Sequence, residues 1–256
     1  MKNTATKSAG IIFPMVLLSF WFSCAPIRQE PSEFKDAEFY NNWGIYYGDR
    51  GQYDQAIVNF TNALEILPSY ADAYRNRGVA YANKGQFDEA ISDYTKALQI
   101  NPKYVDAYYN RGIAYGNKGL NDQAIADFTR VLEMNPKYEY AYYNRGVAYA
   151  NKGQFDQAIS DYTKALQINP KYVDAYFNRG VAYANKGQYD QAISEYTKTL
   201  EMDPKSADAY YDRAVAFYFM KEYDKSWMDV KKVQDLGQTI PADFLARLRK
   251  ASGKQM

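Results

Sequence analysis

The chain has 256 residues, of which 24% are charged, and it carries a net charge of +1 at neutral pH. This balance excludes a polyelectrolyte and provides no basic track of the kind that nucleic-acid binding needs. The chain has no histidine, which is the commonest general base and metal ligand. We therefore expect no catalytic residue, no metal site, no cofactor and no nucleic-acid partner.

The first residues have the pattern of an export signal. Lys2 and Lys7 precede an apolar run over 11–22, which is too short to span a bilayer comfortably and predicts a signal peptide over 1–23. Cys24, the only cysteine, follows this run. With Ser23 before it, the site resembles the lipobox of bacterial lipoproteins, although Trp21 and Phe22 depart from that motif. Cleavage after Ala25 by ordinary signal peptidase is the alternative.

The resemblance implies a lipid attached at Cys24 and a place in the bacterial cell envelope. In a cell with two membranes, it implies the outer membrane, facing the periplasm. Residues 24–36 contain prolines and mixed charges without periodicity, and we expect them to form a tether between lipid and fold.

The rest of the chain repeats itself every 34 residues. The stretch 77–112 returns as 145–180 with only two changes. Self-similarity at a fixed period is typical of a solenoid, in which each unit packs only against its neighbours. The expected units are 37–70, 71–104, 105–138, 139–172, 173–206 and a degenerate 207–240, followed by a capping helix and tail over 241–256.

Each unit, numbered 1 to 34 from its first residue, should form two helices. Apolar residues at positions 4, 8 and 11, and again at 17, 20, 21, 24 and 28, follow a helical period. Glycine at position 15 marks the turn, and proline at position 32 ends the second helix. A glycine at position 8 suggests close approach of the alanine at position 20 on the partner helix. Leu120 and Asn121 replace the usual turn residues of the third repeat, so we expect a looser turn there.

These positions resemble the tetratricopeptide repeat. The matching residues are Tyr at position 4, Gly at 8, Ala at 20, an aromatic residue at 24 and Pro at 32. The resemblance implies an all-α, right-handed superhelical solenoid of about six helix pairs plus a C-terminal capping helix. It also implies a non-enzymatic scaffold that binds a protein partner.

In this family, positions 2, 5, 6, 9, 12 and 13 of the first helix line a concave groove, and we call these positions the groove stripe. The candidate ligand-binding residues on it are Asn76, Tyr109, Asn110, Asn117, Tyr143, Asn144, Asn151, Phe177, Asn178 and Asn185. The alternative is that these asparagines only bond neighbouring backbone.

The stripe is aromatic and amide-rich, with small residues between the rings. We expect it to bind an extended peptide, and an assembly factor is one such role. The other possibility is an envelope glycan, bound by ring stacking and side-chain hydrogen bonds. Arg75 is the only cation among the stripe residues, so the acidic tail of a partner protein is a poor candidate ligand.

Arginine occupies position 7 in repeats two to six, and an acidic residue occupies position 23. Both positions are equally far from the turn, so equal helical rise should bring them level. The first repeat has Trp43 and Asn59 instead, so acid and base disappear together. The expected ion pairs are Arg77 with Asp93, Arg111 with Asp127, Arg145 with Asp161, Arg179 with Glu195, and Arg213 with Asp229. The alternative is that both side chains point to water.

Overall fold

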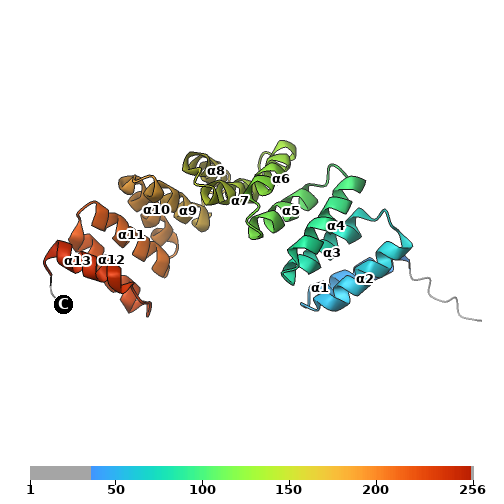
Figure 1. The fold of residues 1–256 in the computed structure, drawn as a ribbon, viewed down its shortest axis with the longest axis horizontal. Coiled ribbons are helices and arrows are strands. Elements are labelled where there is room, and N and C mark those ends of the chain that lie inside the picture. The colour runs from blue at the N-terminus through green and yellow to red at the C-terminus, as the bar shows by residue number, and fades with distance from the viewer. Residues whose placement is uncertain (1–35, 255–256) are drawn as a thin grey trace, which may run out of the picture. The chain divides into compact units, whose positions relative to one another are not determined.

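The computed structural model describes residues 36–254, which form thirteen α-helices and no strand (Figure 1). The predicted signal peptide, Cys24 and the tether up to residue 35 lie outside this range. The helices are α1 (Ala37–Gly48), α2 (Tyr53–Ile66), α3 (Ala71–Asn83), α4 (Phe87–Ile100), α5 (Val105–Asn117), α6 (Asn121–Met134), α7 (Glu139–Asn151), α8 (Phe155–Ile168), α9 (Val173–Asn185), α10 (Tyr189–Met202), α11 (Ala207–Phe219), α12 (Tyr223–Asp235) and α13 (Ala242–Ser252). The predicted all-α solenoid is therefore confirmed. None of these helices is both long and apolar enough to cross a membrane.

The turn inside each repeat depends on a residue with positive φ. Gly153, for example, has a φ of +72°, and the next residue, Gln154, donates its N–H to the carbonyl of Tyr149 at 2.9 Å. Leu120 of the third repeat makes the equivalent bond at 2.9 Å, so the expected looser turn was wrong. The backbone bonds of this turn depend on the preceding glycine and not on the side chains that follow it.

Successive helices pack side by side along the array, and the first helices of adjacent repeats also contact each other. This holds for α1 with α3, α3 with α5, α5 with α7, α7 with α9, and α9 with α11. Within residues 36–254, second helices of adjacent repeats make no comparable contact. The first helices therefore lie closer together and form the inner side of the stack, where the groove stripe is located.

The glycine at position 8 makes room for a ring and not for the alanine that we expected. A Cβ added to Gly146 would lie 2.7 Å from Cε1 of Tyr162, which is at position 24. Tyr162 is 1% exposed, and Ala158 at position 20 is also buried. The sixth repeat has Ala214 with Val230 instead, so the larger first residue accompanies a smaller second one.

Candidate groove and the ion-pair ladder

Cavities follow the groove stripe along the inner side of the first helices. One cavity of about 610 Å³ lies between α1 and α3 and is lined by Asp72, Arg75 and Asn76, among others. Another, of about 260 Å³, lies between α5 and α7 and is lined by Asn117, Asn144 and other stripe residues. Residues at the same repeat positions therefore line both hollows.

The asparagines at position 6 reach back to position 5 of the preceding repeat. Asn144 donates from Nδ2 to the hydroxyl of Tyr109 at 3.1 Å, and Asn178 donates to Tyr143 at 2.9 Å. Asn76 donates to Oδ1 of Asn41 at 3.0 Å. Asn110 is half-buried, and within residues 36–254 its side chain has no hydrogen-bond partner. Asn76, Asn144 and Asn178 therefore link adjacent first helices by hydrogen bonds.

The position-5 rings lie partly under the groove surface. Tyr109 contacts Phe128, with ring centroids 5.9 Å apart, and stacks on Tyr138 at 4.9 Å. Burial raises the pKa of Tyr109 to about 12. Tyr143 and Phe177 likewise pack on the position-24 rings of their own repeats, Tyr162 and Tyr196. The position-5 residues, which we placed on the groove stripe, therefore also contact the core, because a ring is long enough to lie back over it.

The tyrosines at position 34 also belong to this surface, and the sequence analysis missed them. Tyr172 lies 4.7 Å from Tyr143 between ring centroids and 5.5 Å from Tyr140. Tyr140 also contacts Tyr138 at 6.2 Å, and it is 45% exposed. The recurrence of tyrosine at position 34 in the first four repeats is a signal that could have found them.

The asparagines at position 13 are exposed at the end of the first helix. Asn117 and Asn185 donate from Nδ2 to the backbone carbonyls of Ile113 and Val181, four residues earlier. Asn151 is also exposed and lines the cavity between α5 and α7. The alternative interpretation of these asparagines as backbone partners therefore describes part of their bonding.

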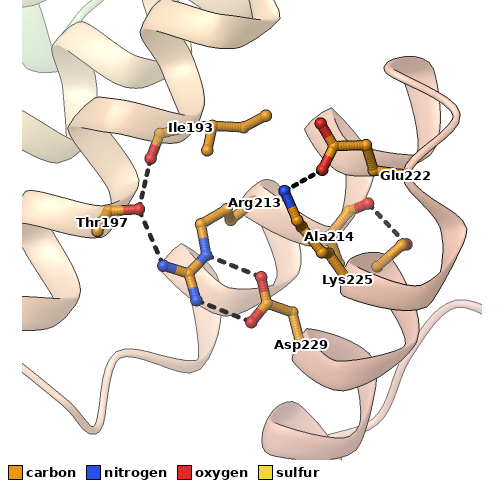
Figure 2. Close-up of polar contacts among 8 residues, drawn as sticks. Ile193, Thr197, Arg213, Ala214, Glu222, Lys225 and Asp229 are labelled. Atoms are coloured by element: carbon orange, nitrogen blue, oxygen red, sulfur yellow. Dashed lines mark hydrogen bonds and ion pairs between the residues drawn. The ribbon is translucent and has the colours of Figure 1, made fainter.

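All five expected position-7 and position-23 pairs lie within hydrogen-bond distance. In the sixth repeat, Nε and Nη2 of Arg213 donate to the two carboxylate oxygens of Asp229 at 2.8 and 2.9 Å (Figure 2). The other four pairs have N–O distances between 2.7 and 2.9 Å. The side chain of Asp161 is only 4% exposed, which makes these partly buried pairs and not surface ones. In the second repeat, the bonds to Asp93 raise the pKa of Arg77, with burial opposing them.

Each arginine also bonds a threonine of the preceding repeat, a contact that sequence reasoning missed. Nη1 of Arg213 donates to Oγ1 of Thr197 at 2.9 Å, and Thr197 donates to the carbonyl of Ile193 (Figure 2). The same bond recurs from Arg77 to Thr61, Arg111 to Thr95, Arg145 to Thr129 and Arg179 to Thr163. Threonine at position 25 precedes every position-7 arginine of the six repeats, which is the signal that could have revealed the link.

The pair in the fifth repeat differs because its acid is glutamate. Arg179 donates from Nη2 to both oxygens of Glu195, at 2.8 Å each. Its Nε is buried and has no hydrogen-bond partner in the described part of the chain. The extra methylene of glutamate therefore exchanges a two-nitrogen contact for a one-nitrogen contact.

Stacked helical hairpins with a lined inner groove define a repeat protein of the solenoid class, in which binding surfaces extend over several units. The chain belongs to the tetratricopeptide-repeat family. Models of the tetratricopeptide repeat match residues 71–104, 105–138, 139–172 and 161–194, and a further model of this repeat matches 44–85 and 182–220. No curated protein matches the chain.

Solved structures share this architecture. The crystal structure of MamA is 30% identical, with a TM-score of 0.61 over 64% of this chain and 96% of that one. The crystal structure of YrrB, described as a TPR protein with an unusual peptide-binding site, is 25% identical, with a TM-score of 0.62 over 76% of this chain and 98% of that one. A tetratricopeptide repeat protein from Parabacteroides merdae, 24% identical, has a TM-score of 0.69 over 85% of this chain and 84% of its own, which shows the fold alone.

Proposed function

We propose that the chain is a non-enzymatic scaffold that binds an extended peptide segment of a partner protein along the groove stripe. The observation that carries this proposal is the recurrence of cavities lined by the same repeat positions, with exposed asparagines beside half-buried aliphatic residues. Main-chain amides of an extended ligand need hydrogen-bonding side chains at regular intervals, and the repeats supply them. The likeness to YrrB, whose title names a peptide-binding site, supports the proposal.

Site-specific photo-crosslinking tests this function. A photoreactive amino acid replaces Asn117 on the stripe in the full chain, and the matched control carries it at Glu65, which is exposed on the second helix α2. We expect a discrete segment of a partner to be captured from position 117 but not from position 65. A synthetic peptide of that segment should then bind the purified chain. Equal capture from both positions, or a peptide that does not bind, would contradict the proposal.

The position-5 rings are unsuitable for this test, because Tyr109, Tyr143 and Phe177 contact core rings. A triple alanine variant would lose folding free energy together with any binding. Asn117, Asn151 and Asn185 are exposed, so alanine at these positions should leave the fold intact while removing groove contacts. Weaker binding of the captured peptide by this triple variant is the expected result.

We also propose that the scaffold is anchored by lipid at Cys24 in the bacterial cell envelope, at the outer membrane facing the periplasm if two membranes are present. An assembly factor for envelope proteins would suit such a place. The charged start, the apolar run over 11–22 and the single cysteine support this. Mass spectrometry of the mature N-terminus tests it, with Cys24→Ala as the control. A mature protein that begins at Pro26, or an unchanged membrane fraction of Cys24→Ala, would contradict it.

A glycan is the second candidate ligand. Tyr140 favours it, because this residue is 45% exposed and its ring lies beside those of Tyr138 and Tyr172 on the groove edge. Exposed rings of this kind stack on sugars. Pull-down of the purified chain with envelope polysaccharide tests the candidate, and Tyr140→Ala should abolish any retention. Retention that does not depend on Tyr140 would count against a groove site for glycan.

A further inference from the structure

The groove stripe is strongly negative, although the chain as a whole is nearly neutral. Its 36 positions over six repeats include seven carboxylates and one arginine, a net charge of −6 on a chain whose net charge is +1. Six of these acids are exposed. Five are at position 2, near the start of the first helix, and one is at position 13, near its end: Glu38, Asp72, Asp106, Asp174, Asp208 and Asp49. The negative charge is therefore concentrated on the surface proposed to bind the ligand.

Arg75 and the lysines at position 14 already have partners. Arg75 donates from Nε to the hydroxyl of Tyr104 at 3.1 Å, and Tyr104 in turn donates to Asp72. The lysines at position 14, just beyond the stripe, each pair with an aspartate on the second helix of the preceding repeat. These pairs are Lys84 with Asp54, Lys118 with Asp88, Lys152 with Asp122 and Lys186 with Asp156. The lysines therefore do not neutralise the stripe.

The asparagine amides add hydrogen-bond acceptors to this negative surface. Asn178 donates from Nδ2 both to the Tyr143 hydroxyl and to the carbonyl of Asp174. Asn83 likewise uses its Nδ2 for the carbonyl of Val79 at 3.0 Å. A carbonyl partner fixes which end of an amide carries the nitrogen, so the Oδ1 atoms remain to accept bonds. A ligand that meets this surface should therefore offer N–H donors.

Asp212 extends the same pattern at the C-terminal end of the stripe. It occupies position 6, where the other repeats have asparagine, and position 5 of the preceding repeat is Phe177 with no hydroxyl to bond. Within residues 36–254, its carboxylate has no hydrogen bond and no ion pair. Arg247 on the neighbouring α13 pairs with Asp243 at 3.1 Å. Burial, together with the nearby Asp208, raises the pKa of Asp212 to about 6.

We propose that the partner segment in the groove is an extended cationic peptide, whose lysine or arginine side chains pair with the stripe carboxylates and with Asp212. This inference rests on the proposed function and names the chemistry of its ligand. Adjacent packed helices lie about 8–10 Å apart, and an extended chain rises about 3.3 Å per residue. One cation at about every third residue would therefore match the spacing of the repeats, each of which except the fourth carries at least one stripe carboxylate.

Fluorescence anisotropy of labelled 18-residue peptides tests the proposal with the full chain in a non-ionic detergent. One peptide has lysine at every third position, and its matched partners have glutamate or glutamine there. We expect the lysine peptide to bind at least about tenfold more tightly than the glutamate peptide, with affinity falling as salt rises because exposed charge pairs are screened. Equal affinity of the three peptides would overturn the proposal.

Two charge-neutralising variants separate groove recognition from general attraction. Asp212→Asn and Asp106→Asn should each weaken binding of the lysine peptide severalfold. Glu65→Gln changes the net charge equally, but on the exposed surface of α2, and it should leave binding unchanged. If Glu65→Gln weakens binding as much as Asp212→Asn does, the attraction is not local to the groove and the proposal fails.

These outcomes are distinguishable from failure of the proposed function. If position 117 captures a partner segment whose synthetic peptide binds but contains no lysine or arginine, the groove binds peptide and the cationic inference is wrong. If position 117 captures nothing beyond the position-65 control, the proposed function itself fails.

Discussion

Arg145 and Asp161 form a two-point ion pair between the two helices of the fourth repeat, with N–O distances of 2.7 and 2.9 Å. The side chain of Arg145 is 14% exposed and that of Asp161 4%. Because both charges are largely removed from water, the attraction of each to the other is what offsets its lost hydration.

Breaking this pair should cost far more than breaking a surface pair. Asp161→Asn and Arg145→Leu should each lower the free energy of unfolding by about 3–5 kcal/mol, because each leaves a buried charge unpaired. The double variant should be partly rescued, since it removes both charges. Chemical denaturation of the four proteins in a double-mutant cycle measures this coupling.

The exposed Lys84–Asp54 pair is the control for that cycle. Its aspartate side chain is 80% exposed, so its removal should cost only about 0–1 kcal/mol. Additive losses at Arg145 and Asp161, or single losses under about 0.5 kcal/mol, would show that the buried pair contributes no more than a surface one.

The glutamate of the fifth repeat should be replaceable with a gain in stability. Glu195→Asp restores the acid of the neighbouring repeats and should let Nε of Arg179 regain a partner, for a gain of about 1 kcal/mol. The matched reverse change, Asp161→Glu, should lose a comparable amount. Urea denaturation midpoints measure both, and a change of the same sign in the two variants would refute the geometric explanation.

A ring sets the requirement for glycine at position 8. Gly146→Ala would place a Cβ 2.7 Å from the Tyr162 ring, so we expect a loss of about 1–3 kcal/mol despite the better helix propensity of alanine. Adding Tyr162→Val recreates the combination of Ala214 and Val230 in the sixth repeat. In the background of Tyr162→Val, Gly146→Ala should be neutral or stabilising in thermal denaturation. A loss of the same size in both backgrounds would contradict this.

The pKa of Asp212 makes a stability prediction that depends on pH. Its pKa is about 6 in the folded chain and 3.8 in the reference state, so the folded state favours the protonated form. The contribution of the protonated Asp212 carboxyl to the free energy of unfolding is therefore complete below about pH 4. It is lost as the pH rises through about 6. Asp212→Asn should therefore stabilise the chain by about 1–3 kcal/mol at pH 7 and much less at pH 4. Denaturation at the two pH values checks this.

The reverse substitution one repeat earlier is the matched control. Asn178→Asp places a carboxylate at position 6 of the fifth repeat and removes the donor to Tyr143. It should destabilise the chain more at pH 7 than at pH 4. A pH-independent effect of both variants would mean that the Asp212 carboxylate is not held in an unfavourable environment.

Much of the fold could be predicted from the sequence, because each repeat contains the residues that end its own helices. Gly153 ends one helix with a positive φ, and Pro170 cannot continue the next helix. That Arg145 lies beside Asp161 follows from counting the helical rise on both sides of the turn. Such quantities depend only on residues within one repeat.

The contacts between repeats were harder to predict. Helical spacing gives the direction of a Cβ, and so it placed Tyr109 on the stripe, but it does not say where the ring attached to that Cβ lies. The ring lies over Phe128 and against Tyr138. Thr129 bonds an arginine sixteen residues later on a helix of the next repeat, a relationship that no single-repeat pattern contains.

The arginine–threonine bonds determine how the repeats depend on one another. Each arginine joins its own hairpin to the hairpin before it, so loss of structure in one repeat removes a bond from the next. The series stops at the last step, where position 25 is Lys231 and Arg247, on α13, bonds Asp243 of its own helix. The six hairpins are therefore coupled in their unfolding, whereas α13 can open from the end of the array without breaking that series.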